Sequence, residues 1–343
     1  MEVRVSDVHR KRPLREVGVA HRSGIGHHAP LPMTLEDTPG VPRVRRGPIP
    51  WLHVPLRASV EEAVSAHEGR PWRIKSEADL SEFACHRCAI VSDGSFSVFF
   101  KYGETSNARE QFATELSGLK TLSATAGILI PEPIGIVPVE GGTLLVLEAL
   151  EAVERGPREW REIGATLARI HRVSGDALGL DTNGFFGPLT QDNAPAPTWA
   201  DFFAQRRLLP LLKTAVDSGH LPHAVAQDME RLIPRIRDLC GPEAAPRLLH
   251  GDAQQNNFIS TAAGTFVIDP AVYYGNPEID LALLDAFQPA PDSVFAGYQD
   301  ETPIDPGFFE RRDLWRLPLY LAAVALEGPD HLSRLTSALR KYV

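Results

Sequence analysis

Asp252, Asn257 and Asp269 are the residues whose types and spacing best suit metal-assisted phosphoryl transfer. Asn257 lies five positions after Asp252 in the pattern His250-x-Asp252-x4-Asn257, and Asp269 follows the apolar run 266–268. In protein kinases this spacing lets an aspartate accept the proton of the substrate hydroxyl while an asparagine and a second aspartate hold magnesium. Magnesium prefers oxygen ligands and keeps several waters, so one carboxylate and one amide suffice beside phosphate oxygens. We therefore expect Asp252 to be the catalytic base and Asn257 and Asp269 to be the metal ligands.

Lys101 and Glu115 form a second candidate pair upstream. Lys101 follows the apolar stretch 98–100, which is typical of a strand, and residues 107–127 have helical periodicity. At about 100° per residue, Glu115 falls within the apolar stripe that contains Phe112. A carboxylate on a buried face is costly unless it is paired, and a lysine from the preceding strand is the natural partner. Kinases use such a pair to position ATP phosphates.

Other sequence signals are weaker. The sequence contains no GxSxG, HExxH, GK[ST] or GxGxxG pattern. Hydrolase, zincin and dinucleotide-binding interpretations therefore lack the motifs on which they depend. Cys85-x-x-Cys88 has metal or redox spacing, but it lies in strand-like sequence without a second ligand pair, so we expect structural cysteines. His171 and Asp280 are also expected to be structural.

Composition sets the class of protein. The chain has 343 residues, 43% hydrophobic and 23% charged, which is typical of a globular protein with room for two domains. No apolar run is long enough to span a membrane, and three cysteines favour a reducing compartment, so the expected location is cytoplasmic. Residues 51–343 carry 26 basic and 39 acidic side chains. This acidic balance argues against nucleic-acid binding.

The order of expected elements predicts the fold. Residues 1–50 contain seven Pro, five Gly and no aromatic residue, so we expect a disordered Pro/Arg-rich arm. A short helix over 59–67, a hairpin over 87–102 turning at Asp93-Gly94, the helix over 107–127 and two strands around Gly141-Gly142 would form an N-terminal nucleotide-binding lobe over 58–150. Helices over 158–174, 196–216 and 221–240 indicate a helical catalytic and substrate lobe over 151–343. The predicted class is α+β, with the two-lobed layout of a protein kinase.

Several sequence blocks resemble one family. From about residue 58 to the C-terminus the chain resembles the fructosamine (ketosamine) 3-kinase family, within the aminoglycoside-phosphotransferase branch of kinase-like folds. The blocks that carry the resemblance are FATELSGLKTL, LLVLEAL, GLDTNGFFGPLTQ, WADFFAQRRLLPLL, LLHGD, DPAVYYGNPEIDLALLDAF and FAGYQDETPIDPGFFERRDLWRLPLY.

The resemblance implies a reaction and a set of roles. ATP and Mg²⁺ would be used to phosphorylate the sugar 3-hydroxyl of a ketosamine, either a free small molecule or a glycated protein. Asp252 would be the base, Asn257 and Asp269 the metal ligands, and Lys101 with Glu115 the phosphate-positioning pair. The backbone from Glu148 to Leu150 would bind adenine.

The sequence departs from the family pattern at two places. Glu77-Ala78 stands where the family has a glycine pair in its phosphate-covering turn, and the catalytic loop reads HGDAQQNN where the family usually reads HGDLWSGN. Gln254 thus replaces an aromatic residue that would cover the sugar. Two alternatives follow from these departures, namely a phosphotransferase for another amino-sugar or aminoglycoside-like metabolite, and a pseudokinase that serves as a binding module.

Overall fold

A twisted antiparallel sheet forms the N-terminal part of the protein. The computed structural model describes residues 45–83 and 85–343, so residues 1–44 of the arm predicted over 1–50 lie outside the described residues. The sheet has the strand order β1-β2-β3-β4-β6-β5. Its strands are β1 (Arg45–Arg46), β2 (Ser76–Asp79), β3 (Arg87–Ser92), β4 (Ser97–Gly103), β5 (Pro133–Val139) and β6 (Gly142–Glu148). The hairpin predicted over 87–102 and the strand pair predicted around Gly141-Gly142 are confirmed.

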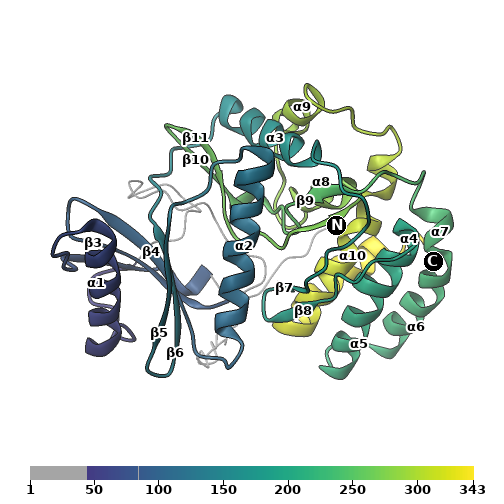
Figure 1. The fold of residues 1–343 in the computed structure, drawn as a ribbon. Helices are drawn as coiled ribbons and strands as arrows, with labels where there is room; N and C mark the ends of the chain where they lie inside the picture. The colour runs from purple at the N-terminus through teal and green to yellow at the C-terminus, as the bar shows by residue number, and fades with distance from the viewer. Residues whose placement is uncertain (1–44, 84) are drawn as a thin grey trace, which may run out of the picture.

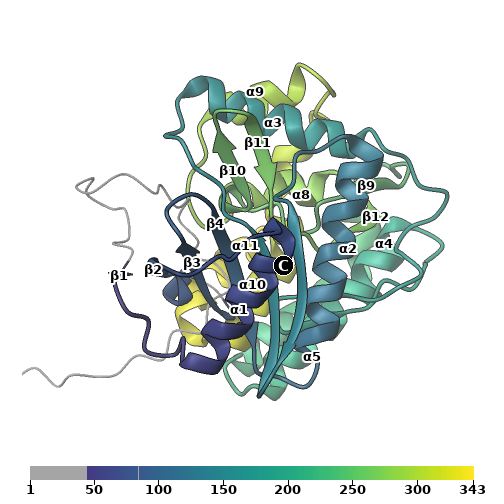
Figure 2. The same ribbon diagram turned by 60° about the vertical axis from the view of Figure 1, so that its left-hand side comes forward.

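Two helices cover the opposite faces of this sheet (Figures 1 and 2). Helix α1 (Val54–Glu68) packs on one face against Phe100 and Tyr102 of β4, whereas α2 (Ala108–Ala126) packs on the other face. Because successive strand residues point to opposite faces, Lys101 lies on the α2 face together with its cross-strand partner Leu145. Helix α2 ends at Gly127, which has the left-handed φ of 64° that glycine adopts at low cost. The alternation of β4 thus directs Lys101 toward α2.

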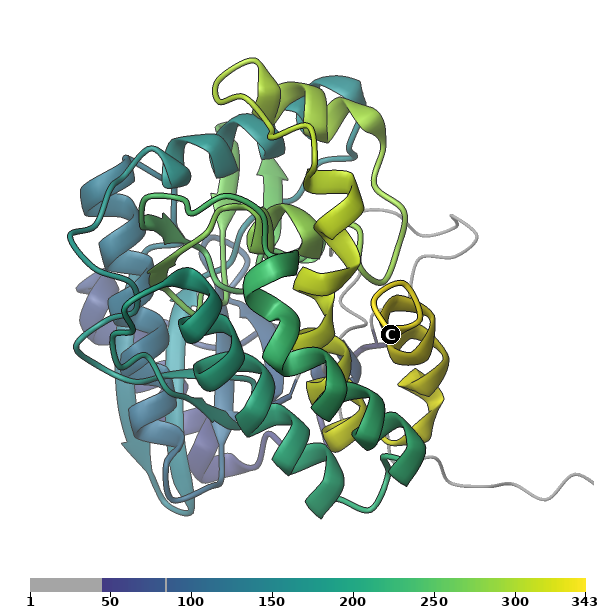
Figure 3. The same ribbon diagram turned by 90° about the vertical axis from the view of Figure 1, so that its right-hand side faces the viewer.

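The chain continues from β6 into a mainly helical part (Figures 1 and 3). A long apolar core unites this part and extends onto the α2 face of the sheet. None of the helices in the described ranges is long and apolar enough to span a membrane. The helices are α3 (Pro157–His171), α4 (Trp199–Phe202), α5 (Leu209–Asp217), α6 (His223–Leu232), α7 (Ile236–Leu239), α8 (Glu278–Leu283), α9 (Asp292–Gln299), α10 (Phe308–Glu327) and α11 (Leu332–Leu339).

Three small hairpins or strand pairs interrupt the helices. They are β7 (Gly184–Phe186) with β8 (Leu189–Gln191), β9 (Arg247–Leu249) with β12 (Tyr273–Gly275), and β10 (Phe258–Thr261) with β11 (Gly264–Val267). The β9–β10 connection is the stretch that contains Asp252 and Asn257, and the chain after β11 contains Asp269. Two short pairs therefore place both predicted metal ligands beside the predicted base.

Helices α3 and α9 approach each other closely because glycines face the contact. A Cβ atom on Gly164 of α3 would lie 1.9 Å from the Val294 carbonyl oxygen, and one on Gly297 of α9 would lie 2.1 Å from the Arg161 carbonyl oxygen. No larger side chain fits at either place without moving a backbone. This packing fixes α3, which ends at His171, against the rest of the helical part.

The structure corrects four expectations about where segments begin, end or are interrupted. Residues 45–50 do not belong to an arm, since Arg45–Arg46 pairs with β2 and Ile49 is buried, and α1 begins at Val54 rather than at residue 59. The helix predicted over 221–240 is interrupted by a 3₁₀ turn at Ile233–Arg235, where Pro234 cannot donate a backbone hydrogen bond. The helix predicted over 196–216 starts at Trp199, capped by Thr198, and contains a π-helical turn at Phe203–Leu208.

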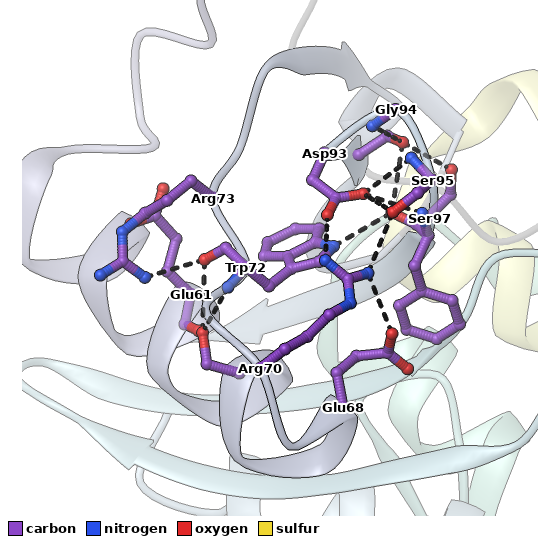
Figure 4. A network of polar contacts seen from close by, with 12 residues as sticks. Glu61, Glu68, Arg70, Trp72, Arg73, Asp93, Gly94, Ser95 and Ser97 are labelled. Carbon is purple, nitrogen blue, oxygen red and sulfur yellow. Dashed lines mark hydrogen bonds and ion pairs between the residues drawn. The ribbon is translucent and has the colours of Figure 1, made fainter.

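A polar network ties the end of α1 to the β3–β4 turn (Figure 4). Asp93 accepts hydrogen bonds from the Ser95 and Phe96 amides, each 2.8 Å long, and from the Arg70 guanidinium at 2.7 Å. Arg70 holds the pKa of the Asp93 carboxyl well below its usual range, and the two amides contribute in the same direction. The turn predicted at Asp93-Gly94 is thus locked by the aspartate's own side chain.

Candidate active site

The loop from His250 to Asn257 is shaped by one tight approach between backbones. Gly251 has a φ of 81°, and a Cβ atom there would lie 2.0 Å from the Ala271 carbonyl oxygen. The Ala271 amide donates to the His250 carbonyl at 2.8 Å, and the Ile268 amide donates to the Asn257 carbonyl at 3.0 Å. The segment with Asp252 and the segment with Asp269 are therefore hydrogen-bonded side by side.

Asp280 anchors this loop by accepting hydrogen bonds from its backbone. Its carboxylate is completely buried and accepts hydrogen bonds from the His250 amide at 2.7 Å and the Gly251 amide at 3.0 Å. His171 Nε2 lies 3.1 Å from the same carboxylate, and His171 Nδ1 lies 2.9 Å from the Tyr298 hydroxyl. The expectation that His171 and Asp280 are structural is correct but incomplete, because together they hold the backbone two residues before Asp252. The sequence signal for this role is an acidic residue, Asp280, among the apolar residues at the start of α8.

Glu115 and Asp269 form ion pairs with the buried Lys101 ammonium. Lys101 Nζ lies 2.8 and 2.9 Å from the two carboxylate oxygens of Glu115 and 2.5 Å from Asp269 Oδ1. Lys101 is 7% exposed. Burial alone would lower the pKa of Lys101, but the Asp269 and Glu115 carboxylates outweigh burial and raise it, so the ammonium is charged. The predicted pairing of Lys101 with Glu115 is present, and Asp269 joins it.

Asp269 occupies an unusual backbone conformation. Its φ is 53°, and it is the only non-glycine residue with positive φ among residues 45–83 and 85–343. The left-handed region costs a non-glycine residue on the order of 1 kcal/mol, and such residues concentrate at functional sites.

Two side-chain amides hold the Asp252 carboxylate. Gln254 Nε2 donates to Oδ1 at 2.8 Å, and Asn257 Nδ2 donates to Oδ2 at 3.1 Å and to the Asp252 carbonyl at 2.8 Å. Burial raises the pKa of Asp252 to about 7, against the opposing effect of the two amides and with a further increase from Asp269. A carboxylate with this pKa can accept a proton near neutral pH. From the sequence, Gln254 is seen only as the replacement of an aromatic residue, whereas in the structure it donates a hydrogen bond to Asp252.

One cleft brings most of the predicted site residues together. Lys101, Glu115, Asp252, Asn257 and Asp269 all line it, although they come from β4, α2 and the segments around β10 and β11. The cleft has a volume of about 850 Å³, which includes the space open to solvent at its mouth.

Glu148 and Leu150 are not among the residues that line this cleft. They lie at the end of β6, where the Glu148 amide donates to the Glu132 carbonyl at 2.9 Å and the Ala149 amide to the Ser97 carbonyl at 3.0 Å. The Leu150 amide has no acceptor among the described residues. The structure thus leaves Leu150 as a backbone donor at the edge of β6, outside the cleft around Asp252.

Glu77 does not occupy the phosphate-covering turn, contrary to expectation. It lies within β2, where its carboxylate accepts from the Ile49 amide at 2.9 Å and forms an ion pair with Arg57. The chain turns between β2 and β3, after Asp79. The charge of Glu77 is therefore neutralised on the α1 side of the protein, and it gives no reason to expect poor nucleotide binding.

The oxygen donors present fit magnesium. Asn257 supplies an amide oxygen, because its nitrogen donates to Asp252, and Asp269 supplies a carboxylate. Among the residues that the structure describes, no group of three or more His, Cys, Asp or Glu side chains could hold a metal alone. This donor set suits an ion that takes its remaining ligands from phosphate and water.

The amino-acid sequence of the chain is similar to those of several known proteins. The family model described as fructosamine kinase matches residues 56–343. A probable ketoamine kinase of Synechocystis sp. is 31% identical over 86% of this chain and 97% of its own length. The ketosamine-3-kinase of Mus musculus is 28% identical over 65% of this chain and 81% of its own length.

Solved structures show the same fold. A putative fructosamine-3-kinase from Haemophilus somnus superposes with a TM-score of 0.74 at 25% identity, covering 83% of this chain and 97% of its own. An aminoglycoside phosphotransferase in ternary complex with AMP-PNP and hygromycin B superposes with a TM-score of 0.53 at 17% identity, covering 82% of this chain and 98% of its own. The predicted α+β kinase-like class is confirmed, and the chain belongs to the fructosamine kinase family, whose members are phosphotransferases acting on a sugar hydroxyl.

Proposed function

We propose that the protein transfers the γ-phosphoryl group of ATP to the 3-hydroxyl of a ketosamine in the cleft around Asp252. The observation that carries this proposal is the convergence of Lys101, Glu115, Asp252, Asn257 and Asp269 on one cleft in a chain of the fructosamine kinase family. ATP as donor is supported by the distant structural neighbour that holds AMP-PNP. The acceptor class is supported by the names of the relatives.

Asp252 acts on the acceptor. Its carboxylate orients the hydroxyl and takes its proton as the acceptor oxygen forms a bond to the γ-phosphorus and the bond to the β-phosphate oxygen breaks, which releases ADP. Gln254 and Asn257 hold the carboxylate from both sides, so the base keeps one orientation. A pKa near 7 matches this role.

Lys101 acts on the donor. Its charge is maintained by Glu115 and Asp269, and a buried ammonium aimed into the cleft stabilises charge on phosphate oxygens more strongly than one in water. Asn257 and Asp269 would hold Mg²⁺, which when bound would neutralise phosphate charge and orient the γ-phosphoryl group. The Leu150 amide at the end of β6 would bind adenine, together with the backbone carbonyl of Glu148.

The direct test uses purified protein, Mg·ATP and a fructosamine made from glucose and Nα-acetyl-lysine. We expect ADP release coupled to phosphorylation of the acceptor, and loss of turnover by at least 10²-fold in Asp252→Asn and Asp269→Ala. The same fructosamine borne on a glycated protein tests whether macromolecular acceptors are used. Near-normal turnover in Asp252→Asn would refute the assigned base, and absence of turnover by the unmodified protein would refute the acceptor class.

A further inference from the structure

One aromatic side chain in the cleft has no part in the chemistry described above. Phe185 and Phe186 both line the cleft, at the tip of the β7–β8 hairpin. Phe186 also packs against the large apolar core, whereas Phe185 belongs to neither core cluster of the described residues. Its ring is half-buried within the cleft, so the apolar core does not account for its position.

The hairpin that carries Phe185 is held rigidly at its base. Arg207, in the π-helical turn, donates to the Asp192 carbonyl at 2.6 Å and to Asn193 Oδ1 at 2.7 Å. Asn193 in turn donates to the Thr182 carbonyl at 3.1 Å. The Arg207 guanidinium also lies 4.0 Å from the ring centre of Tyr273. The segments before and after the hairpin are thus joined through Asn193, which Arg207 holds. Turns of π-helix often occur at functional sites.

The cleft also contains polar side chains. Asp252 and Gln254 line it together with Thr114 and Gln111 of α2. Gln111 is 7% exposed and adds a further polar side chain to the lining. Small-molecule sites commonly combine an aromatic surface with a few polar groups that fix orientation. A sugar presents this pair of properties, with apolar C–H faces and hydroxyl groups around its edge.

We propose that Phe185 is the residue that packs against the sugar ring of the acceptor and thereby determines acceptor affinity. This inference rests on the proposed function and adds the subsite that receives the sugar. Phe185 supplies a flat apolar surface in the same cleft as Asp252.

Steady-state kinetics of Phe185 variants test the proposal. Phe185→Leu keeps apolar volume but removes the flat ring, and Phe185→Tyr keeps the ring. We expect KM for the fructosamine to rise roughly tenfold in Phe185→Leu, with KM for ATP unchanged, and to stay within about twofold in Phe185→Tyr. Phe309→Leu is the matched control, because Phe309 is 55% exposed and absent from the cleft lining. Its kinetics should equal those of the unmodified protein.

Two acceptors separate contact with the sugar from contact with the amine. Fructosamines made from Nα-acetyl-lysine and from ethanolamine share the sugar, so an equal rise in KM for both supports the sugar contact. A rise confined to one acceptor, or equal KM values for Phe185→Leu and the unmodified protein, overturns it. If the unmodified protein phosphorylates neither compound, the acceptor class itself is wrong, which is distinct from a specific failure at Phe185. Melting temperatures of the variants show whether any loss reflects unfolding.

Discussion

Replacing Asp280 should disable the site without touching any atom of the substrate. In Asp280→Ala the His250 and Gly251 amides and His171 Nε2 lose their shared acceptor in a fully buried environment. Hydrogen bonds to a charged group contribute about 1.5–3 kcal/mol each, but they do not add independently. Breaking a buried charged cluster by removing one partner typically costs about 3–5 kcal/mol. We expect a loss of that size in the free energy of unfolding.

The assay pairs thermal unfolding with turnover. A loss of 3–5 kcal/mol corresponds to a decrease in melting temperature of roughly 10 °C for a domain of this size. Because the two amides lie one and two residues before Asp252, kcat should fall at temperatures where the protein is still folded. Asp280→Asn keeps the volume and one oxygen acceptor, so it should lose about half as much stability.

Asp238→Ala serves as the control for Asp280→Ala. Asp238 is exposed on α7, and its replacement should change stability by no more than about 0.5 kcal/mol. If Asp280→Ala unfolds within 1 kcal/mol of the unmodified protein and keeps its kcat, the anchoring role of Asp280 is wrong.

Three further changes test separate parts of the structure. The raised pKa of Asp252, about 7, means that the native state binds more protons than the unfolded state between about pH 4 and pH 7, so this group lowers stability as pH rises through that window. Without nucleotide or metal, Asp252→Asn should therefore be more stable than the unmodified protein at pH 8, by about 1–3 kcal/mol in the free energy of unfolding. Near pH 4 the two proteins should be equally stable. Denaturant titration measures both values, and an equal difference at the two pH values would contradict this reasoning. Glu77→Ala should lower the free energy of unfolding by about 1–2 kcal/mol, because the contacts with Arg57 and Ile49 are lost. KM for ATP should stay unchanged, and a change in KM would show that Glu77 takes part in nucleotide binding. Gly164→Ala should lower stability by about 3 kcal/mol or more because its Cβ atom would lie 1.9 Å from the Val294 carbonyl, and a melting temperature equal to that of the unmodified protein would show that α9 can move away freely.

Local periodicity in the sequence was enough to predict the Lys101–Glu115 pair. Strand alternation directs Lys101 to one face of β4, and helical spacing places Glu115 on the buried face of α2. The loop of the candidate base could be proposed for a similar reason, because the five-residue spacing of Asp252 and Asn257 is a property of one short segment. The two-lobed order of strands and helices was likewise readable from the sequence, as was the family.

Only the tertiary structure determined what supports and surrounds these residues. Asp280 and His171 are 109 residues apart in the chain, and no local pattern states that both reach the loop before Asp252. Glu77 was misassigned because the resemblance placed Glu77-Ala78 at the family's glycine pair, whereas the contacts of Glu77 are with Arg57 and Ile49. Phe185 lies 67 residues before Asp252 in the sequence, and Arg207 fastens its hairpin beside the cleft. The sequence by itself therefore determined the candidate reactive groups, since these depend on short-range spacing. Packing between distant segments decided how those groups are held and which other side chains line the cleft.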